Sequence, residues 1–322
     1  MNKNVFQKFQ PKAKEFTDSG LSNQVSNQSK RLINPDGTFN IRRTGRHPLH
    51  ELSIAHSLIS MSWPRYLLWV SGFYITVNLI FALAYYWIGM EDFMGVVASN
   101  KLEEFREAFF FSAQTLTTVG FGRLNPLGFW VNAISTLEAL VGLLTFAIVT
   151  GLMYGRFARA VAHLIFSTNA LISPYKDINA LMFRVANAKN NDMSDVEVQV
   201  LLSLVVFEDN RFIRRYYGLE LERKSINALS LSWTIVHPID EKSPLYGFTP
   251  QMCEEFEAEI LVTIKGFDPT FSQTVQTRTS YHYSSFVWNA KFRPAFRRSE
   301  DGHDTILALN ELSHYDLLPA KN

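Results

Sequence analysis

The hexapeptide TTVGFG at residues 117–122 lies between two long apolar segments, and it decides how the rest of the chain is interpreted. Successive carbonyls of such a loop can point to one side only if some residues take a positive φ, which glycine does without a Cβ clash. Gly120 and Gly122 stand at alternate positions, as that backbone geometry requires. We therefore predict a loop whose carbonyl oxygens form one wall of a cation path.

The segments around this loop have the lengths expected of membrane helices. Residues 66–88 carry no charge, and residues 129–154 carry only Glu138. About 20 apolar residues span ~30 Å of hydrocarbon, so each segment can cross a bilayer. Residues 103–116 are amphipathic and too short to cross, which fits a re-entrant helix whose partly negative C-terminal end points at the loop.

Together these features predict a K⁺ selectivity filter. Stacked rings of backbone carbonyls replace the water that a K⁺ ion loses, and four loops of the TVGYG type build such rings. The predicted ligands of K⁺ are the carbonyls of Thr118, Val119, Gly120 and Phe121, with the Thr118 hydroxyl innermost. Because one chain gives only one wall, a homotetramer is part of the prediction. The alternative is a glycine-rich turn between two anchoring helices.

The remaining sequence indicates an α + β membrane protein with four parts. Residues 1–46 form an N-terminal segment, and residues 47–62 an amphipathic helix, either lying in the interface plane or serving as an ordinary linker. Residues 63–160 form the two-helix pore domain. Residues 161–322 consist of short strands separated by turn signals, which favours a β-sandwich. The strands are expected at residues 181–189, 196–207, 229–236, 259–265 and 271–283.

Composition narrows the possible functions. The single cysteine, Cys253, cannot form an internal disulfide and indicates a reducing compartment. A net charge of +1 argues against a nucleic-acid partner. No catalytic triad, metal cluster or nucleotide loop stands out, so we expect neither an enzyme nor a cofactor, and K⁺ only as the permeant ion. Lys and Arg flanking the two spans place both termini in the cytoplasm.

The second span carries a stripe that can line a pore. Phe146, Thr150 and Tyr154 recur at i, i+4 and i+8, and each step drifts by only ~40° on a helix of 3.6 residues per turn. Four copies of this stripe predict a cavity that narrows to a gate at Tyr154, because rings of bulky side chains can exclude water. The alternative for Phe146 and Tyr154 is ordinary helix packing.

Three other positions of the second span have a predicted role. Glu138 is costly inside a membrane, and its position, rotated ~80° from Phe146, places it behind the loop as a support of the filter. Gly142 and Gly151 are either bending points or sites of close helix packing.

Three stretches resemble the prokaryotic inward-rectifier potassium channels. AFFFSAQTLTTVGFG (108–122) is similar to the pore helix and filter of that family, GLMYGRFARA (151–160) to its inner-helix end, and LSWTIVHPIDEKSPLYG (231–247) to a signature of its cytoplasmic domain. The resemblance implies a tetramer in the bacterial inner membrane, with two helices per subunit above an immunoglobulin-like cytoplasmic sandwich. It also implies a constriction at Tyr154 and a cavity-lining position at Phe146.

The chain departs from the family pattern near the loop. Phe121 stands where Tyr is common, and Gln114 where a pore-helix Glu is common, so Gln114 is expected to support the filter by hydrogen bonding alone. Arg123 replaces a frequent Asp and is expected to lower the cation concentration at the outer mouth. The pore-flanking cysteine pair of animal members is not present, which favours the prokaryotic branch.

Two regulatory expectations follow from the resemblance. Arg156 and Arg159 are expected to attract anionic lipid headgroups, at ~1 kcal/mol each, or else to be ordinary flanking charges. The positions where strong rectifiers carry an acid are here Thr145, Phe146 and Val149 in the cavity and Thr263 and Lys265 in the cytoplasmic domain. We therefore predict weak block by polyamines.

Two other functions stay open from the sequence. The first is a membrane-tethered β-sandwich adaptor, which needs neither a re-entrant helix nor the TVGFG string. The second is a less selective cation channel, which the aromatic residue between Gly120 and Gly122 disfavours.

Overall fold

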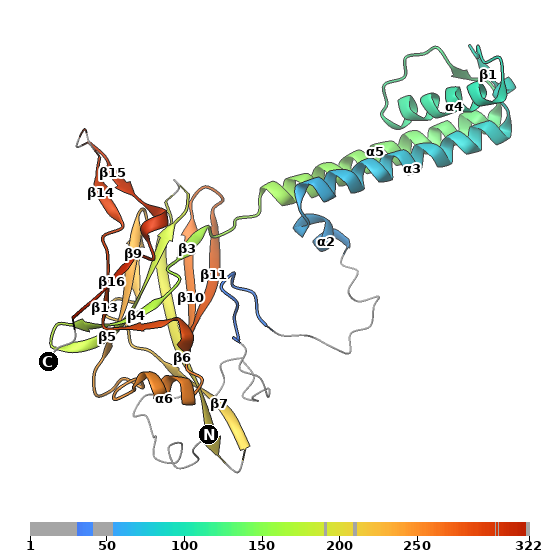
Figure 1. Ribbon diagram of the computed structural model, residues 1–322. Coiled ribbons are helices and arrows are strands. Elements are labelled where there is room, and N and C mark those ends of the chain that lie inside the picture. Colours follow the sequence, from blue (N-terminus) through green and yellow to red (C-terminus); the bar gives the residue numbers. More distant parts are fainter. Residues whose placement is uncertain are drawn as a thin grey trace. The chain divides into compact units, whose positions relative to one another are not determined.

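The computed structural model describes residues 31–40, 54–189, 192–208, 211–299, 301 and 303–319. The chain divides into two compact units. One, called the helical unit, spans Thr44–Arg159; the other, called the β unit, joins the N-terminal residues up to Arg43 to everything from Ala160 onward. Figure 1 shows helices in the first and predominantly strands in the second.

The helical unit contains the helices expected from the apolar pattern. They are α2 (Ile54–Ser60), α3 (Trp63–Ile88), α4 (Lys101–Leu116) and α5 (Phe129–Phe157). The short elements η2 (Met90–Asp92), β1 (Phe93–Met94) and β2 (Asn125–Pro126) connect them. Pro64 lies in the first turn of α3, where its missing N–H has no cost. Residues 47–53 of the predicted interfacial helix lie outside the described residues.

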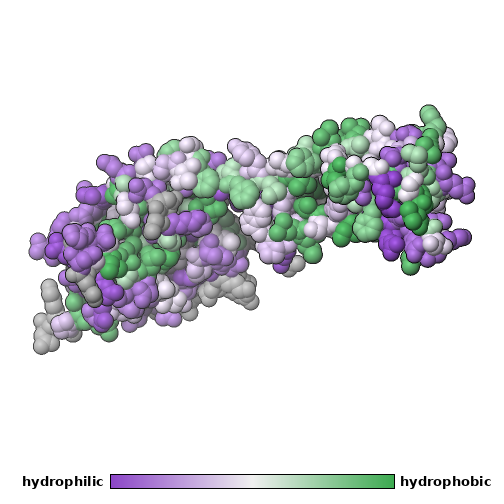
Figure 2. Space-filling view, turned by 90° about the horizontal axis from the view of Figure 1, so that it is seen from above, coloured by the Kyte–Doolittle hydropathy of each residue, from purple (hydrophilic) through white to green (hydrophobic). Residues whose placement is uncertain are grey.

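Helices α3 and α5 run antiparallel. The Tyr66 hydroxyl donates to the Val149 carbonyl at 3.3 Å, and the rings of Trp63 and Phe157 lie 4.9 Å apart. At 26 and 29 residues, both helices are long and apolar enough to cross a membrane. Figure 2 shows hydrophobic residues gathered over this part of the surface.

The β unit is built from two five-stranded sheets. The first has the order β11–β10–β6–β7 with β8 paired to β6, and the second has the order β12–β4–β5–β3 with β9 paired to β5. The strands of the first sheet are β6 (Ser194–Glu208), β7 (Arg211–Gly218), β8 (Ser225–Ala228), β10 (Glu259–Asp268) and β11 (Gln273–His282). Those of the second are β3 (Leu164–Phe166), β4 (Ala170–Tyr175), β5 (Ile178–Asn187), β9 (Ser232–Ile239) and β12 (Phe286–Trp288).

The main core lies between these sheets and confirms the predicted sandwich. Phe183 of β5 and Tyr281 of β11 face each other with ring centroids 5.2 Å apart. Alternate residues of each strand enter this core because successive side chains of a strand point to opposite faces. The smaller elements α6 (Pro250–Glu255), β13 (Ala290–Phe292), β14 (Phe296–Arg298), β15 (Thr305–Leu307) and β16 (Tyr315–Leu317) lie around the sandwich.

Residues 31–40, here called the N-terminal strap, cover the outer face of the first sheet. Ile33 pairs with Phe39 in a tight hairpin and packs against Tyr216 and Leu261. The backbone N–H of Leu32 donates to both carboxylate oxygens of Glu259, each at 3.0 Å. Strand β10 is therefore buried on both faces near its start. The alternation of apolar and polar residues in β10 did not by itself predict that the N-terminal strap covers its outer face.

Candidate functional site

The loop at residues 117–122 is fixed to the end of α4 by backbone hydrogen bonds. The N–H of Thr118 donates to the Thr115 carbonyl at 3.0 Å, and that of Val119 donates to the Gln114 carbonyl at 2.9 Å. These bonds satisfy carbonyls that the last turn of a helix otherwise leaves unpaired. Gln114 therefore contacts the loop through its backbone carbonyl. The sequence analysis had expected a hydrogen bond from its side chain.

Left-handed backbone conformations alternate along the loop. Thr118, Gly120 and Gly122 have φ angles of 59°, 54° and 78°. The glycines adopt positive φ as their position in the sequence predicts, whereas a β-branched residue such as Thr118 rarely does. Residues with strained backbone conformations of this kind are concentrated at functional sites, where contacts with the surrounding structure stabilise them. Positive φ at every second residue is the backbone pattern that the sequence analysis expected of this loop.

The loop is open on the side away from α4. All its residues are exposed, and Phe121 keeps 78% of its surface. Beside it lies a cavity of about 510 Å³, lined by the end of α4 and by α3 and α5. One chain thus presents a single wall, and a closed ring of carbonyls needs further copies.

Glu138 lies behind the loop in a buried polar cluster. Its carboxyl group accepts a hydrogen bond from the Tyr85 hydroxyl at 2.5 Å and forms another with the Ser112 hydroxyl. Ser112 also contacts the Asn78 side chain at 3.0 Å. Asn78, Tyr85, Ser112 and Glu138, here called the polar cluster, are all fully buried and come from α3, α4 and α5. The sequence analysis singled out Glu138 as a filter support but assigned no such role to the other three members of the cluster.

Two glycines of α5 have different surroundings. A Cβ added to Gly142 would lie 2.1 Å from the Leu116 carbonyl oxygen, whereas one added to Gly151 would meet nothing within 4 Å. Gly142 is therefore a close-packing site that lets α5 touch the end of α4 just before the loop. At Gly151 the open space leaves bending available.

The predicted pore stripe is unpartnered within one chain. Phe146 and Tyr154 expose 73% and 75% of their surfaces, and Thr150 is also exposed. Bulky aromatic side chains left open in this way are not packing residues of the single chain. The geometry leaves them free to line a space shared with other copies.

Arg123 does not present a free positive charge beside the loop. Its guanidinium lies 3.0 Å from the carboxylate of Glu107, whose side chain is only 9% exposed. The expected lowering of the cation concentration at the outer mouth is therefore corrected, because the carboxylate largely offsets the arginine charge.

The two arginines at the end of α5 differ. Arg156 donates through Nη1 to the carbonyls of Leu58 and Ile59 at 2.5 and 3.0 Å, and through Nη2 to that of Met61 at 2.7 Å. Arg159 follows the end of α5 and is exposed. Only Arg159 therefore has the open surroundings expected of a headgroup ligand.

The β unit has its own buried polar group in the stretch that resembles a family signature. His237 is 2% exposed; its Nδ1 lies 2.5 Å from the Glu220 carbonyl oxygen and its Nε2 lies 2.7 Å from the Ser243 hydroxyl. Burial lowers the pKa of His237 below its ordinary value, partly offset by the hydrogen bond to Glu220. The histidine ties β9 to the following turn.

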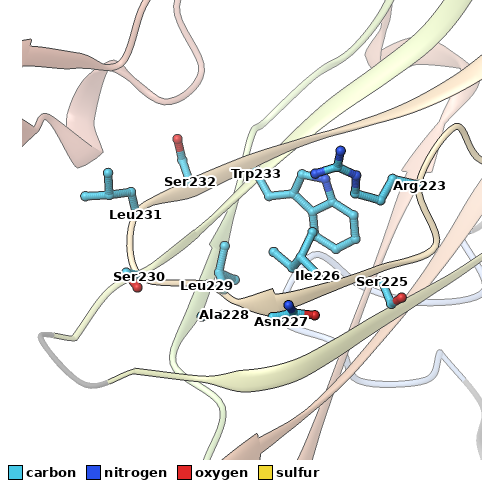
Figure 3. A pocket seen from close by; sticks show the side chains of 10 residues that line it. All are labelled: Arg223, Ser225, Ile226, Asn227, Ala228, Leu229, Ser230, Leu231, Ser232 and Trp233. Carbon is cyan, nitrogen blue, oxygen red and sulfur yellow. The ribbon is translucent and has the colours of Figure 1, made fainter.

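An open pocket of about 700 Å³ follows β8 and β9 in the β unit (Figure 3). Arg223 and several hydroxyl groups face it, and Trp233 forms part of its wall. Among the residues that the structure describes, no group of three or more His, Cys, Asp or Glu side chains is placed to hold a metal ion.

Two long apolar helices with a glycine-bearing loop between them are expected of an ion channel, and comparison with known proteins shows that class. Residues 73–159 match the family profile described as "Ion channel", and residues 164–313 match the one described as "Inward rectifier potassium channel C-terminal domain". The two matched regions correspond to most of the helical unit and most of the β unit.

Curated relatives identify the family more closely. The chain is 36% identical over 278 residues to inward rectifier potassium channel Kirbac3.1 of Paramagnetospirillum magnetotacticum, covering 86% of this chain and 92% of that protein. It is 25% identical to ATP-sensitive inward rectifier potassium channel 12 of Gallus gallus, over 82% of this chain and 67% of that protein. Human inward rectifier potassium channel 4 is 31% identical over 59% of this chain and 45% of its own length.

The chain belongs to the prokaryotic inward-rectifier potassium channels. It is therefore a membrane protein and an ion channel, and the enzyme class is excluded by its family. Membership also favours a channel over the tethered adaptor.

Proposed function

We propose that four copies of this chain form a K⁺-selective pore that conducts passively. The carbonyls of Thr118, Val119, Gly120 and Phe121 replace the ion's water, and Gly122 completes the backbone geometry. The observation that supports this is the alternation of left-handed φ angles along an exposed loop at the end of α4. Gln114 and the polar cluster around Glu138 hold the loop from behind.

The proposed gate is a ring of Tyr154 side chains where the inner helices converge. Phe146 and Thr150 line the cavity above it. Support comes from the exposure of all three side chains on one chain, which leaves this stripe available to line a shared pore, where rings of bulky side chains can exclude water. The β unit, which follows the helical unit in the chain at residues 159–160, acts on this gate from the cytoplasm, where both termini lie. In a bacterium the membrane is the inner one.

An ion-flux assay tests the pore. Purified protein is reconstituted into liposomes, and uptake of ⁸⁶Rb⁺ is measured. Na⁺ is added as a competing ion and Ba²⁺ as a blocker. Preferred uptake of Rb⁺ and K⁺, with block by Ba²⁺, is expected. Uptake without preference would indicate the less selective cation channel, and no uptake in any lipid composition would overturn the pore itself.

We further propose that polyamines block this pore weakly. The cavity positions Thr145, Phe146 and Val149 offer no carboxylate, and neither Thr263 nor Lys265 of β10 supplies one. A cationic blocker therefore lacks the opposite charge that holds it in a low-dielectric cavity. Patch recordings with internal spermine are expected to show little voltage-dependent block. Block as steep as a strong rectifier's contradicts this.

Anionic lipids are proposed to modulate the channel through Arg159. Its side chain is exposed just beyond the end of α5, where a basic residue attracts headgroups by about 1 kcal/mol. Flux in liposomes with and without phosphatidylglycerol, compared for the parent chain and Arg159→Gln, tests this. An unchanged lipid response in the variant removes Arg159 from the proposal.

A further inference from the structure

Ser112 lies at the centre of the polar cluster and has one proton for two neighbouring oxygen atoms. Its Oγ contacts Oε1 of Glu138 and, at 3.0 Å, Oδ1 of Asn78. A serine hydroxyl carries a single proton, so it can donate to only one of these atoms. Which oxygen receives that proton decides where the hydrogen of the other contact comes from, and therefore whether Glu138 is charged.

The orientation of the Asn78 amide is fixed by the backbone. Its Nδ2 lies 2.7 Å from the carbonyl oxygen of Tyr74, one turn earlier on α3. A carbonyl oxygen can only accept, so the amide must present its NH₂ group to Tyr74 and its own oxygen to Ser112. Turning the amide over would place two acceptors against each other. The Ser112 proton therefore goes to Asn78, and the hydrogen between Ser112 and Glu138 must belong to Glu138.

The surroundings of Glu138 also favour its neutral form. The residue is fully buried, and residues 66–88 and 129–155 contain no other charged side chain. Within the described part of the chain, its hydrogen-bond partners are the hydroxyls of Tyr85 on α3 and Ser112 on α4. The other buried carboxylate of α4, Glu107, is instead ion-paired with Arg123 at 3.0 Å. An unpaired charge in a membrane interior is costly, so Glu138 without a basic partner is more stable as an acid.

We propose that Glu138 binds a proton and acts as a neutral carboxylic acid, which donates to Ser112 while it accepts from Tyr85. The donors then run from Glu138 through Ser112 and Asn78 to the Tyr74 carbonyl, and every contact contains one hydrogen. One consequence rests on the proposed filter: a neutral Glu138 supports the loop without placing a fixed negative charge behind the permeant ion.

Infrared spectroscopy tests the proton directly, because a protonated carboxylic acid has a carbonyl stretch that an ionised carboxylate lacks. Spectra of the full-length parent chain and of Glu138→Gln are recorded at neutral pH in a detergent without ester groups. The acid band is expected in the parent and should be lost in Glu138→Gln. Glu107→Gln is the matched control and should keep the band, because it removes a buried carboxylate that has an arginine partner.

The glutamine of Glu138→Gln can accept from Tyr85 and donate to Ser112, so we expect this variant to assemble. One of its amide hydrogens has no acceptor in the cluster, so its melting temperature should lie below that of the parent.

Asn78→Leu tests the proton count itself. Without the amide oxygen, the Ser112 hydroxyl is free to donate to Glu138, and an ionised carboxylate gains a second donor. As the pH is raised, the acid band should therefore disappear at a lower pH in Asn78→Leu than in the parent. This variant also provides the test if Glu138→Gln does not assemble.

Two outcomes overturn the proposal. One is a parent spectrum without an acid band that Glu138→Gln removes, which would mean that Glu138 is ionised. The other is an acid band that disappears at the same pH in Asn78→Leu and in the parent, which would mean that Ser112 does not give its proton to Asn78. Because the spectra require no conduction, failure of the proposed pore is recognised separately, by a parent chain that gives no ⁸⁶Rb⁺ flux.

Discussion

The loop at residues 117–122 and the polar cluster lie on either side of the same helix end, yet they differ in how they are completed. The four residues of the cluster are fully buried, and they hydrogen-bond to one another within one chain. The loop is exposed along its length; its start is hydrogen-bonded to the end of α4, and the Gly122 carbonyl accepts a hydrogen bond from the Asn125 side chain. The support is finished in the single chain, whereas the proposed ion path requires other copies.

This difference has a physical cause. A polar side chain left unpaired in a membrane costs several kcal/mol, so α3, α4 and α5 must supply partners for one another before any assembly. Carbonyls that bind a permeant ion must instead remain available to that ion. Substitutions in the loop should therefore reduce conduction alone. Substitutions in the cluster should reduce both conduction and the stability of the fold.

The largest expected effect is at Gly120. Alanine at a residue with φ of 54° costs about 1–2 kcal/mol in each copy, although the added Cβ meets nothing within 4 Å. We expect Gly120→Ala to reduce ⁸⁶Rb⁺ flux at least tenfold (roughly 1.4 kcal/mol) with the fold of the chain retained. Gly72→Ala, in an equally open position on α3, is the control and should conduct normally. Normal flux through Gly120→Ala would remove the loop from the ion path.

Next in size is Glu138→Ala, which leaves the hydroxyls of Tyr85 and Ser112 buried without this hydrogen-bond partner. Each such group costs about 1–3 kcal/mol, so the assembly should dissociate at a lower temperature and lose its preference for K⁺ over Na⁺. Size-exclusion chromatography after heating, together with competition flux, measures both. Glu138→Gln is the milder variant; unchanged conduction and thermal stability in it would end the supporting role of Glu138.

A smaller loss is expected at Gly142, where cluster and loop meet. A Cβ there would lie 2.1 Å from the Leu116 carbonyl oxygen, and overpacking of this kind costs about 1–3 kcal/mol. Gly142→Ala should lower the melting temperature and reduce flux by shifting the end of α4. Gly151→Ala, with open space around it, is the matched variant. Equal melting temperatures for the two would contradict close packing at Gly142.

The smallest effect is expected at His237 in the β unit. Like the polar cluster, this side chain is buried and has its hydrogen-bond partners within one chain. Its folded pKa lies below the ordinary value of 6.5, so between those two pKa values the unfolded chain binds more protons. The stability of the β unit should therefore fall as pH drops below about 6.5. His237→Gln should weaken this pH dependence in thermal unfolding of the full-length chain.

His282→Gln provides the control for that measurement. The pKa of His282 is also lowered, first by burial and then by the nearby charges of Arg31 and Arg214, but its side chain is only partly buried. It should alter the pH dependence less than His237→Gln does. The reverse order would show that the buried His237 does not dominate this acid sensitivity.

Much of the fold could be predicted from local patterns. The apolar runs gave α3 and α5 to within a few residues, and the amphipathic stretch gave α4. Strands β5, β6, β9, β10 and β11 were expected close to their observed positions, whereas β3, β4, β7 and β8 were not. The missed strands are mostly short, and the strap that buries the start of β10 comes from more than 200 residues earlier in the chain.

The site shows the same division. Gly120 and Gly122 were identified because only a backbone requirement explains glycines at alternate positions. Tyr85 pairs with Glu138 across 53 residues, and Arg123 is offset by Glu107 from another element. Patterns of neighbouring residues cannot reveal such pairs, because the partners meet only when the helices pack.

The sequence by itself determined the two spans, the short helix between them and a glycine-bearing loop, since hydrophobic length and backbone freedom are local properties. Only the tertiary structure decided that Arg156 belongs to the end of α2, that Arg123 is offset by a carboxylate, and that four side chains from three helices share one buried network. Those outcomes depend on which charges and hydroxyls are brought within hydrogen-bond distance once water is excluded, and that is set by packing between distant parts of the chain.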